Sequence, residues 1–158
     1  MPKGIFILDT NAHELIYGEA LHAEIARRVD LVPGVHTKES IAKRPELLAD
    51  VEVIFSGWGA PVMDEAFLVA APKLRAVFYG AGSIKAMTPE AFWARGIVVT
   101  SAYAMNAIPV AEFTLASVLL SLKRVWYYAL ETKRLAAFPP QNVKHPGAYG
   151  SKVGLISY

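Results

Sequence analysis

Short apolar runs alternate with amphipathic segments along roughly the first hundred residues of the chain. The runs are four to six residues long and are apolar at consecutive rather than alternate positions. Consecutive apolar positions are typical of strands buried on both faces of a parallel sheet. The expected strands are Ile5–Leu8, Leu31–Val35, Val51–Ser56, Leu74–Tyr79 and Ile97–Thr100.

The amphipathic segments between these runs predict helices. They lie within His13–Val29, at Thr37–Leu48, at Asp64–Ala71 and from Thr88 to Gly96. Thr37 and Thr88 are candidate N-caps, and Pro45 is expected to interrupt or end the first part of its helix. Strands that alternate with helices predict an α/β protein with a flavodoxin-like, doubly wound, mostly parallel sheet.

The remaining residues do not fit a plain module of this kind. Pro109–Leu135 is expected to be one helix about 40 Å long, and its first half is apolar nearly all round, which indicates burial on several sides. A Pro- and Gly-rich stretch then leads to an apolar strand that starts at Lys152. The expected domains are 1–105, a long interdomain helix within 106–135, a linker at 136–151, and the start of a second, truncated domain at 152–158.

Composition excludes several classes of protein. The chain has 158 residues, of which 54% are hydrophobic and 19% charged, so it is not a disordered tail. It has no cysteine, which excludes disulfides and cysteine-ligated metals. The net charge is +2 and the basic residues are scattered, so no nucleic-acid partner is indicated.

A membrane location is not expected. The first apolar run is too short for a signal peptide. The stretch Gly96–Leu122 has Glu112 as its only charged residue. It nevertheless contains Pro109 and several hydroxyl groups, and its first part is predicted to be a strand and a loop, so a single membrane-spanning helix is not expected. We therefore expect a soluble, cytoplasmic protein with no membrane partner.

The residues that could bind a ligand are expected in the loops at the carboxyl ends of the strands, where open α/β sheets bind ligands. Gly80 and Gly82 leave backbone N–H groups accessible to an anion, although such turns need glycine anyway. Asn106 is either a cap of the long helix or a ligand-binding residue, and Trp58 is either a loop anchor or a pocket wall. The three loops concerned are Ser56–Gly59, Tyr79–Ser83 and Ser101–Asn106.

Other polar residues carry less information. Glu112 is favoured by the dipole of its helix, so a structural role is expected. The four histidines, which are His13, His22, His36 and His145, have no spacing that suggests a metal site or a triad. No GxSxG, HExxH or complete GxGxxG motif occurs. Spacing alone therefore indicates an α/β domain with a candidate anion loop, no metal site and no catalysis.

One long segment resembles a known family. The sequence LRAVFYGAGSIKAMTPEAFWARGIVVTSAYAMNAIPVAEFTLASVLL is similar to the central stretch of the D-isomer-specific 2-hydroxyacid dehydrogenases. That family carries a G-x-G substrate loop, a short helix, a GI-x-V strand and N-x-x-(S/P)-VAE at the start of its interdomain helix. The terminal KVGLISY resembles its first Rossmann strand. The resemblance runs from about residue 45 to the end.

The resemblance implies two α/β domains, with an NAD-binding domain inserted into the substrate domain. It implies that the backbone N–H groups of Ala81 and Gly82 bind the substrate carboxylate with help from Asn106, while Val110 packs near the nicotinamide. The implied substrate-binding residues are Trp58, Gly80, Ala81, Gly82 and Asn106. The partner is a small 2-hydroxy or 2-oxo acid.

The family's catalytic Arg, Glu and His and its later glycines have no counterpart in this chain, and Ser157 stands where many members have the first glycine. No residue of this chain is therefore expected to be catalytic. The resemblance implies NAD or NADP as the cofactor of the complete protein, and we expect neither to bind to this chain alone. The alternative is a non-catalytic carboxylate-binding or regulatory module, which the apolar terminal LISY disfavours. A receiver-like domain is disfavoured because Asp9 has no second carboxylate beside it.

Self-association through the long helix, for example as a homodimer, is also expected; the alternative is that the C-terminal half of this helix swings away from the sheet. Without a second domain, five large apolar side chains of the helix cannot all be buried by residues 1–105. They are Phe113, Leu119, Leu120, Leu122 and Trp126.

Overall fold

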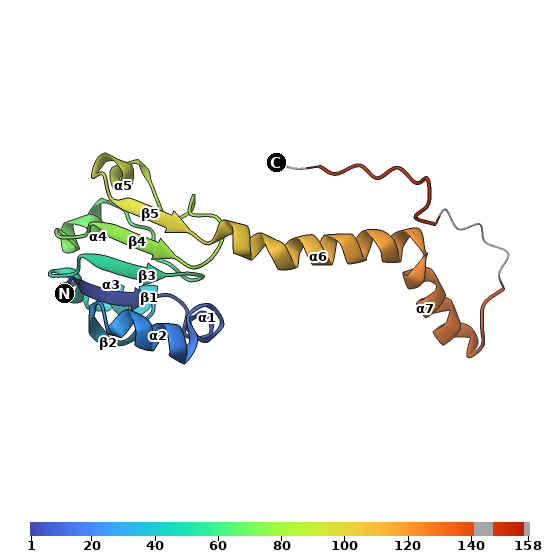
Figure 1. Cartoon of the computed structure of the whole chain (residues 1–158), viewed down its shortest axis with the longest axis horizontal. Helices are drawn as coiled ribbons and strands as arrows, with labels where there is room; N and C mark the ends of the chain where they lie inside the picture. The colour runs from blue at the N-terminus through green and yellow to red at the C-terminus, as the bar shows by residue number, and fades with distance from the viewer. Residues whose placement is uncertain (141–146, 157–158) are drawn as a thin grey trace. The chain divides into compact units, whose positions relative to one another are not determined.

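The computed structural model describes residues 1–140 and 147–156, and the chain divides into two compact units, residues 1–106 and 107–158. The first unit is built on a parallel sheet of five strands in the order β2-β1-β3-β4-β5 (Figure 1). The strands are β1 Lys3–Ile7, β2 Asp30–His36, β3 Val53–Ser56, β4 Ala76–Tyr79 and β5 Val98–Ser101. The predicted α/β class and the five expected strands are confirmed.

The strand order explains why helices cover both faces. The chain passes from β1 to β2 in one direction and then through β3, β4 and β5 in the other. Right-handed crossovers therefore place the first connection on one face and the later ones on the opposite face. The first face carries α1 Thr10–Ile16 and α2 Gly18–Ala26. The second carries α3 Lys38–Lys43, the 3₁₀ helix η1 Pro45–Leu48, α4 Glu65–Ala70 and α5 Glu90–Ala94.

Strand β1, which lies between β2 and β3, contributes side chains to two apolar cores. Ile5 and Ile7 pack with the helices of the second face, whereas Phe6 and Leu8 pack under α1 and α2. All four side chains are fully buried. This two-sided burial accounts for the consecutive apolar residues in the sequence.

Within residues 1–106, the first face is covered only over β2, β1 and β3. On β4 and β5 the same face leaves Phe78 42% exposed and Val98 62% exposed. Phe78 stacks on Phe55 of β3, with ring centroids 5.5 Å apart. An apolar half-face of the sheet is therefore open in this unit.

The helix boundaries differ in part from those expected. The segment His13–Val29 is divided between two helices, because Gly18, the first residue of α2, adopts a left-handed φ of 57°. Thr37 caps α3 as predicted, and its hydroxyl accepts the N–H of Ser40 at 3.3 Å. The cap predicted at Thr88 is wrong: Pro89 occupies the N-cap position, and the Thr88 hydroxyl donates to the Ile84 carbonyl at 2.9 Å.

The long helix is not continuous. Helix α6 runs over Tyr103–Leu122 and α7 over Val125–Leu135, so the helix predicted from Pro109 to Leu135 begins earlier and breaks near its middle. The break is at Arg124, which has a left-handed φ of 54°. Its N–H bonds to the Ser121 carbonyl at 3.0 Å, a tightened last turn that ends α6.

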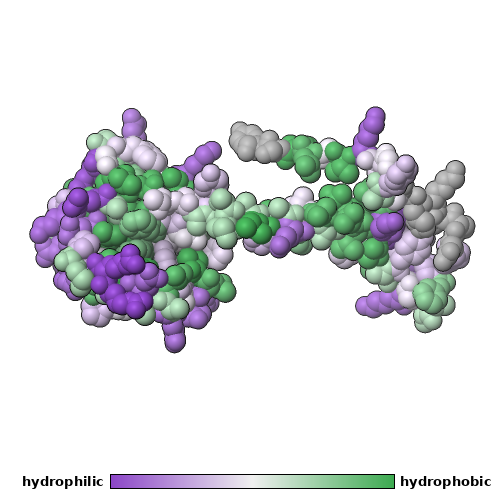
Figure 2. Space-filling model, viewed as in Figure 1, coloured by the Kyte–Doolittle hydropathy of each residue, from purple (hydrophilic) through white to green (hydrophobic). Residues whose placement is uncertain are grey.

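In α6 and α7 no described residue is fully buried, and apolar side chains show at the surface of α6 (Figure 2). Phe113, Leu119 and Trp126 are 76%, 43% and 58% exposed, and Leu120 and Leu122 are half-buried, in line with the expectation that the five are not all buried. Helix α6 is long and apolar enough to cross a membrane by length and composition alone, the criterion that a core helix of a soluble protein also meets.

Residues 152–156 have no regular secondary structure. The strand expected from Lys152 is therefore not formed in the described part of the chain, which gives it no neighbouring strand to pair with. Lys152 and Val153 instead line a shallow cavity with α6 residues of the second unit, among them Phe113 and Val118. Ser157 and Tyr158, with which the predicted strand ends, lie outside the described residues.

Candidate functional site

The carboxyl edge of the sheet brings the three glycine-containing or polar loops together. Parallel strands end at the same edge, and the strand order places the loop after β4 between those after β3 and β5. Two backbone hydrogen bonds link them: Gly80 N–H to the Ser56 carbonyl at 2.9 Å, and Ala102 N–H to the Tyr79 carbonyl at 3.0 Å. The candidate site lies at this edge, as α/β sheets predict.

Ser101 fixes the orientation of the loop after β4. Its hydroxyl lies 3.0 Å from the Ala81 carbonyl oxygen and also within hydrogen-bond distance of the Gly82 carbonyl oxygen. In a planar trans peptide the C=O and the next N–H point in opposite directions. The N–H groups of Gly82 and Ser83 therefore point away from Ser101.

These N–H groups are free to bind an anion. Ala81, Gly82 and Ser83 donate no backbone hydrogen bond to any residue within 1–140 or 147–156. Ala81 is fully buried and Gly82 is half-buried. Ser83 is exposed. Consecutive backbone N–H groups without a partner are typical of an anion-binding loop.

Asn106 lies beside this loop. A Cβ added to Gly82 would lie only 3.0 Å from Asn106 Nδ2, so glycine is needed here for close approach rather than for a positive φ. Asn106 is not the helix cap that we considered, because its own N–H bonds to the Ala102 carbonyl at 2.9 Å inside α6. Its side-chain amide is thereby placed next to the free N–H groups.

Gly80 is explained by packing. A Cβ at this position would collide with Cγ2 of Ile16 and would lie 3.4 Å from the Tyr17 hydroxyl. Tyr17, which the sequence did not single out, donates to the carbonyls of Ser56 at 2.8 Å and Phe78 at 3.1 Å. Burial raises the pKa of Tyr17 well above its ordinary value. Tyr17 thus links the α1–α2 turn to the ends of β3 and β4.

Trp58 lies in the loop after β3 and is 48% exposed. It lines a cavity of about 550 Å³ at the carboxyl ends of β1, β2 and β3. Its carbonyl accepts the Asp9 N–H at 2.8 Å. The next residue, Gly59, has a φ of 83°, and a Cβ there would overlap the Asp9 carboxylate. The other lining residues are Thr10, Asn11, Ala12, Leu15 and Thr37.

The remaining predicted residues are less informative. Val110 follows Asn106 by one helical turn in α6 and is 60% exposed. His13 Nε2 lies 3.0 Å from His22 Nδ1, a pairing that the sequence did not predict, and His145 lies outside the described residues. No group of three or more potential metal-ligating His, Asp or Glu residues occurs in the described ranges.

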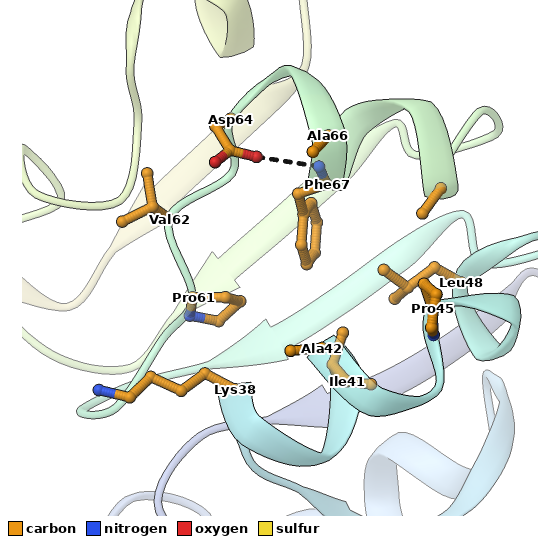
Figure 3. A pocket seen from close by; sticks show the side chains of 11 residues that line it. Lys38, Ile41, Ala42, Pro45, Leu48, Pro61, Val62, Asp64, Ala66 and Phe67 are labelled. Carbon is orange, nitrogen blue, oxygen red and sulfur yellow. Dashed lines mark hydrogen bonds between the residues drawn. The ribbon is translucent and has the colours of Figure 1, made fainter.

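A second cavity, of about 430 Å³, lies between α3, η1 and α4 on the other face (Figure 3). Its lining is apolar apart from Lys38 and Asp64 at its margins. The Asp64 carboxylate accepts the Phe67 N–H at 3.0 Å and so caps α4. This cavity therefore offers packing surface rather than chemistry.

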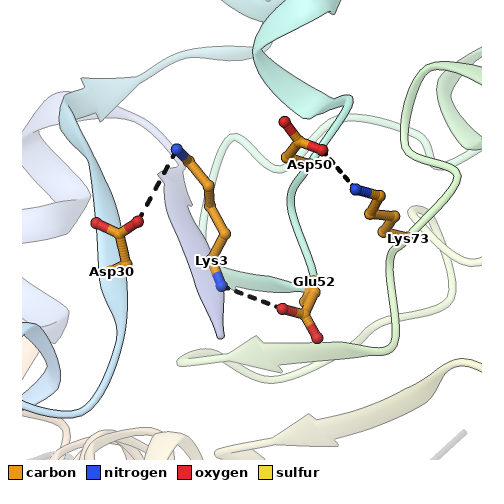
Figure 4. A network of polar contacts seen from close by, with 5 residues as sticks. All are labelled: Lys3, Asp30, Asp50, Glu52 and Lys73. Carbon is orange, nitrogen blue, oxygen red and sulfur yellow. Dashed lines mark hydrogen bonds and ion pairs between the residues drawn. The ribbon is translucent and has the colours of Figure 1, made fainter. Parts of the chain in front are cut away.

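The amino edge of the sheet has a different character (Figure 4). Lys73 Nζ lies 2.6 Å from Asp50, and Lys3 Nζ lies 3.9 Å from Asp30. The hydrogen bond from Lys73 lowers the pKa of Asp50. The carboxylates at this edge are paired with cations, whereas Asp9 at the carboxyl edge is not.

Comparison with known proteins gives the fold. No protein-family model matches the chain, and no curated protein matches it. The structure is similar to a D-lactate dehydrogenase from Aquifex aeolicus solved with NAD and lactic acid, with a TM-score of 0.66 and 19% identity over 90% of this chain and 40% of that one. It is also similar to a phosphoglycerate oxidoreductase from Rhizobium etli, with a TM-score of 0.62 and 19% identity over 97% of this chain and 46% of the other. The chain thus spans less than half the length of either and shares their fold over that part.

Proposed function

We propose that this chain is the substrate-binding part of an NAD(P)-dependent D-2-hydroxyacid dehydrogenase. The observation that carries the proposal is the juxtaposition of the free N–H groups of residues 81–83 with the Asn106 amide. The same residues match the family's sequence pattern, and the fold is shared with two oxidoreductases.

The proposed chemistry follows from holding an acid by its carboxylate. The resemblance assigns the carboxylate to the N–H groups of Ala81 and Gly82; in this proposal the N–H groups of residues 81–83 bind one or both carboxylate oxygens, and the Asn106 amide adds a further donor. The acid is then oriented with its C2 carbon fixed for hydride transfer. When bound in the complete protein, the nicotinamide cofactor supplies the hydride chemistry, with Val110 near it. The residues of this chain bind and orient the acid.

The test is binding of D-lactate to the 158-residue chain, followed by amide NMR. We expect shifts at Ala81, Gly82 and Ser83, with a millimolar dissociation constant. Asn106→Ala should weaken binding roughly tenfold or more, because it removes a hydrogen bond to a charged group. Thr100→Ala is the matched control, since Thr100 makes no side-chain hydrogen bond in the described structure.

The chain alone should neither turn over 2-oxo acids with NADH nor bind NAD more tightly than about 1 mM. Calorimetric binding of NAD below that value would contradict this part of the proposal. Equal shifts with propionate, which lacks the 2-hydroxyl group, would instead favour the alternative of a general carboxylate-binding module.

We further propose that the chain self-associates through α6, as a homodimer in the simplest case. The support is the row of apolar side chains exposed on that helix, which include Leu115 and Leu119 at 62% and 43%. A contiguous apolar surface of this kind usually finds a partner.

A further inference from the structure

The Asp9 carboxylate stands without a partner at the carboxyl edge of the sheet. Asp9 is the N-cap residue of α1, yet its side chain makes no capping hydrogen bond. It forms no ion pair or side-chain hydrogen bond with any part of the chain that the structure describes. The carboxylate instead lies against Gly59, whose missing Cβ leaves room for it.

Asp9 shares its cavity with groups suited to a polar, uncharged ligand. Trp58 supplies an apolar wall, while Thr10, Asn11 and Thr37 supply hydroxyl and amide groups that both donate and accept. No Lys, Arg or His lines this cavity among the described residues. A carboxylate in such surroundings accepts a hydrogen bond from a hydroxyl group and repels an anion.

The strand order sets the approximate separation between the strand ends that carry Asp9 and the carboxylate-binding loop. Asp9 follows β1, Trp58 follows β3 and Ala81 follows β4, and these three strands are consecutive neighbours. Two strand spacings amount to about 10 Å. Hydrogen bonds of about 3 Å at each end leave roughly 4 Å, close to the separation between the carboxylate and the far substituent of a four-carbon acid.

We propose that Asp9, with Trp58 beside it, makes this site select 2-hydroxy acids that carry a hydroxyl group at the far end and reject those that carry a second anionic group there. The inference rests on the proposed function, because it assumes that residues 81–83 and Asn106 hold the substrate carboxylate. Asp9 is then a specificity residue that contacts the substrate's distal hydroxyl group, and Trp58 packs on the carbon chain between the two polar ends.

Three four-carbon probes test the inference with the 158-residue chain. They are D-2,4-dihydroxybutanoate, D-malate and D-2-hydroxybutanoate, which differ only in a terminal hydroxymethyl, carboxylate or methyl group. We expect the dihydroxy acid to bind about tenfold more tightly than malate at low salt, with 2-hydroxybutanoate between them. Higher salt should reduce the discrimination against malate, because it screens charge repulsion.

Asp9→Asn should leave the fold intact and bring the affinity for malate close to that for the dihydroxy acid. Glu14→Gln, which removes a negative charge from an exposed position of α1 outside this cavity, should preserve the discrimination against malate. If the three acids bind equally well to the natural chain, or if Asp9→Asn leaves the discrimination unchanged, the inference is overturned while the proposed function stands. If none of them binds, the proposed function itself fails.

Discussion

The hydroxyl of Ser101 lies 3.0 Å from the carbonyl oxygen of Ala81, so the last residue of β5 holds the loop that follows β4. The two residues are 20 positions apart in sequence. This contact turns the N–H groups of Gly82 and Ser83 away from the strand end, which makes Ser101 the positioning residue of the proposed carboxylate site.

Replacing Ser101 with Ala should therefore loosen the loop. We expect a loss of about 1 kcal/mol in the free energy of unfolding, the usual value of one such hydrogen bond, together with weaker binding of D-lactate. Urea unfolding and the NMR titration measure the two effects. Thr100→Ala should leave lactate binding unchanged, and a Ser101→Ala chain that binds lactate normally would contradict the positioning role.

Gly82→Ala tests the closeness of Gly82 and Asn106. The new methyl group would lie 3.0 Å from Asn106 Nδ2, so the amide must move away from the loop. We expect lactate binding to fall roughly tenfold, with a modest loss of stability of about 1 kcal/mol. The double variant Gly82→Ala/Asn106→Ala should recover the stability but not the binding. If Gly82→Ala costs nothing by either measure, the two residues are not in contact.

The strands of the sheet could be predicted from the sequence, because a run of consecutive apolar residues indicates a strand that is buried on both faces. Ile5–Leu8 is apolar at every position since both of its faces are covered, and that signal is local. The break at Arg124 could not be predicted, because arginine gives no sign of a left-handed φ and the surrounding residues favour helix.

The candidate site was partly predictable for a similar reason. Gly82 and Asn106 stand out as turn and cap residues, and parallel topology brings their loops together. Tyr17 and Asp9 carry no local signal: Tyr17 acts by reaching backbone carbonyls 39 and 61 residues away, and Asp9 by lying against Gly59. These contacts of Tyr17 and Asp9 depend on the tertiary packing of distant segments, which the pattern of apolar and polar residues along the chain does not indicate.

Tyr17 should make stability fall at alkaline pH. Because burial raises its pKa, the folded chain keeps the phenol protonated where the unfolded chain ionises. The resulting stabilisation is complete below pH about 10 and is lost as the pH rises above that value. Tyr17→Phe should cost about 1–2 kcal/mol at neutral pH through the lost hydrogen bonds, and should then lose less stability between pH about 9 and 11. Tyr149→Phe, at a fully exposed position, is the control and should match the natural chain at both pH values.

Arg124→Gly should stabilise the junction between α6 and α7. Arg124 adopts a φ of 54°, which costs a residue with a side chain about 1 kcal/mol relative to glycine. Ala136, with a φ of 51° after α7, should respond in the same way. Ala129→Gly, inside α7, is the control and should instead lower stability by about 1 kcal/mol. Thermal unfolding followed by circular dichroism measures the three changes, and a loss of stability in Arg124→Gly would show that the junction is helical.

Self-association should depend on one face of α6. Leu115 and Leu119 lie four residues apart and are 62% and 43% exposed, and each buried leucine contributes roughly 1.5–3 kcal/mol. We therefore expect the chain to sediment as a dimer or larger species at tens of micromolar, and Leu115→Gln/Leu119→Gln to shift it to monomer. Val69→Gln, which removes an 80% exposed apolar side chain from α4, should leave the association unchanged. A natural chain that sediments as a clean monomer, or that partitions into lipid vesicles in place of associating, would show that the apolar face of α6 has a different partner.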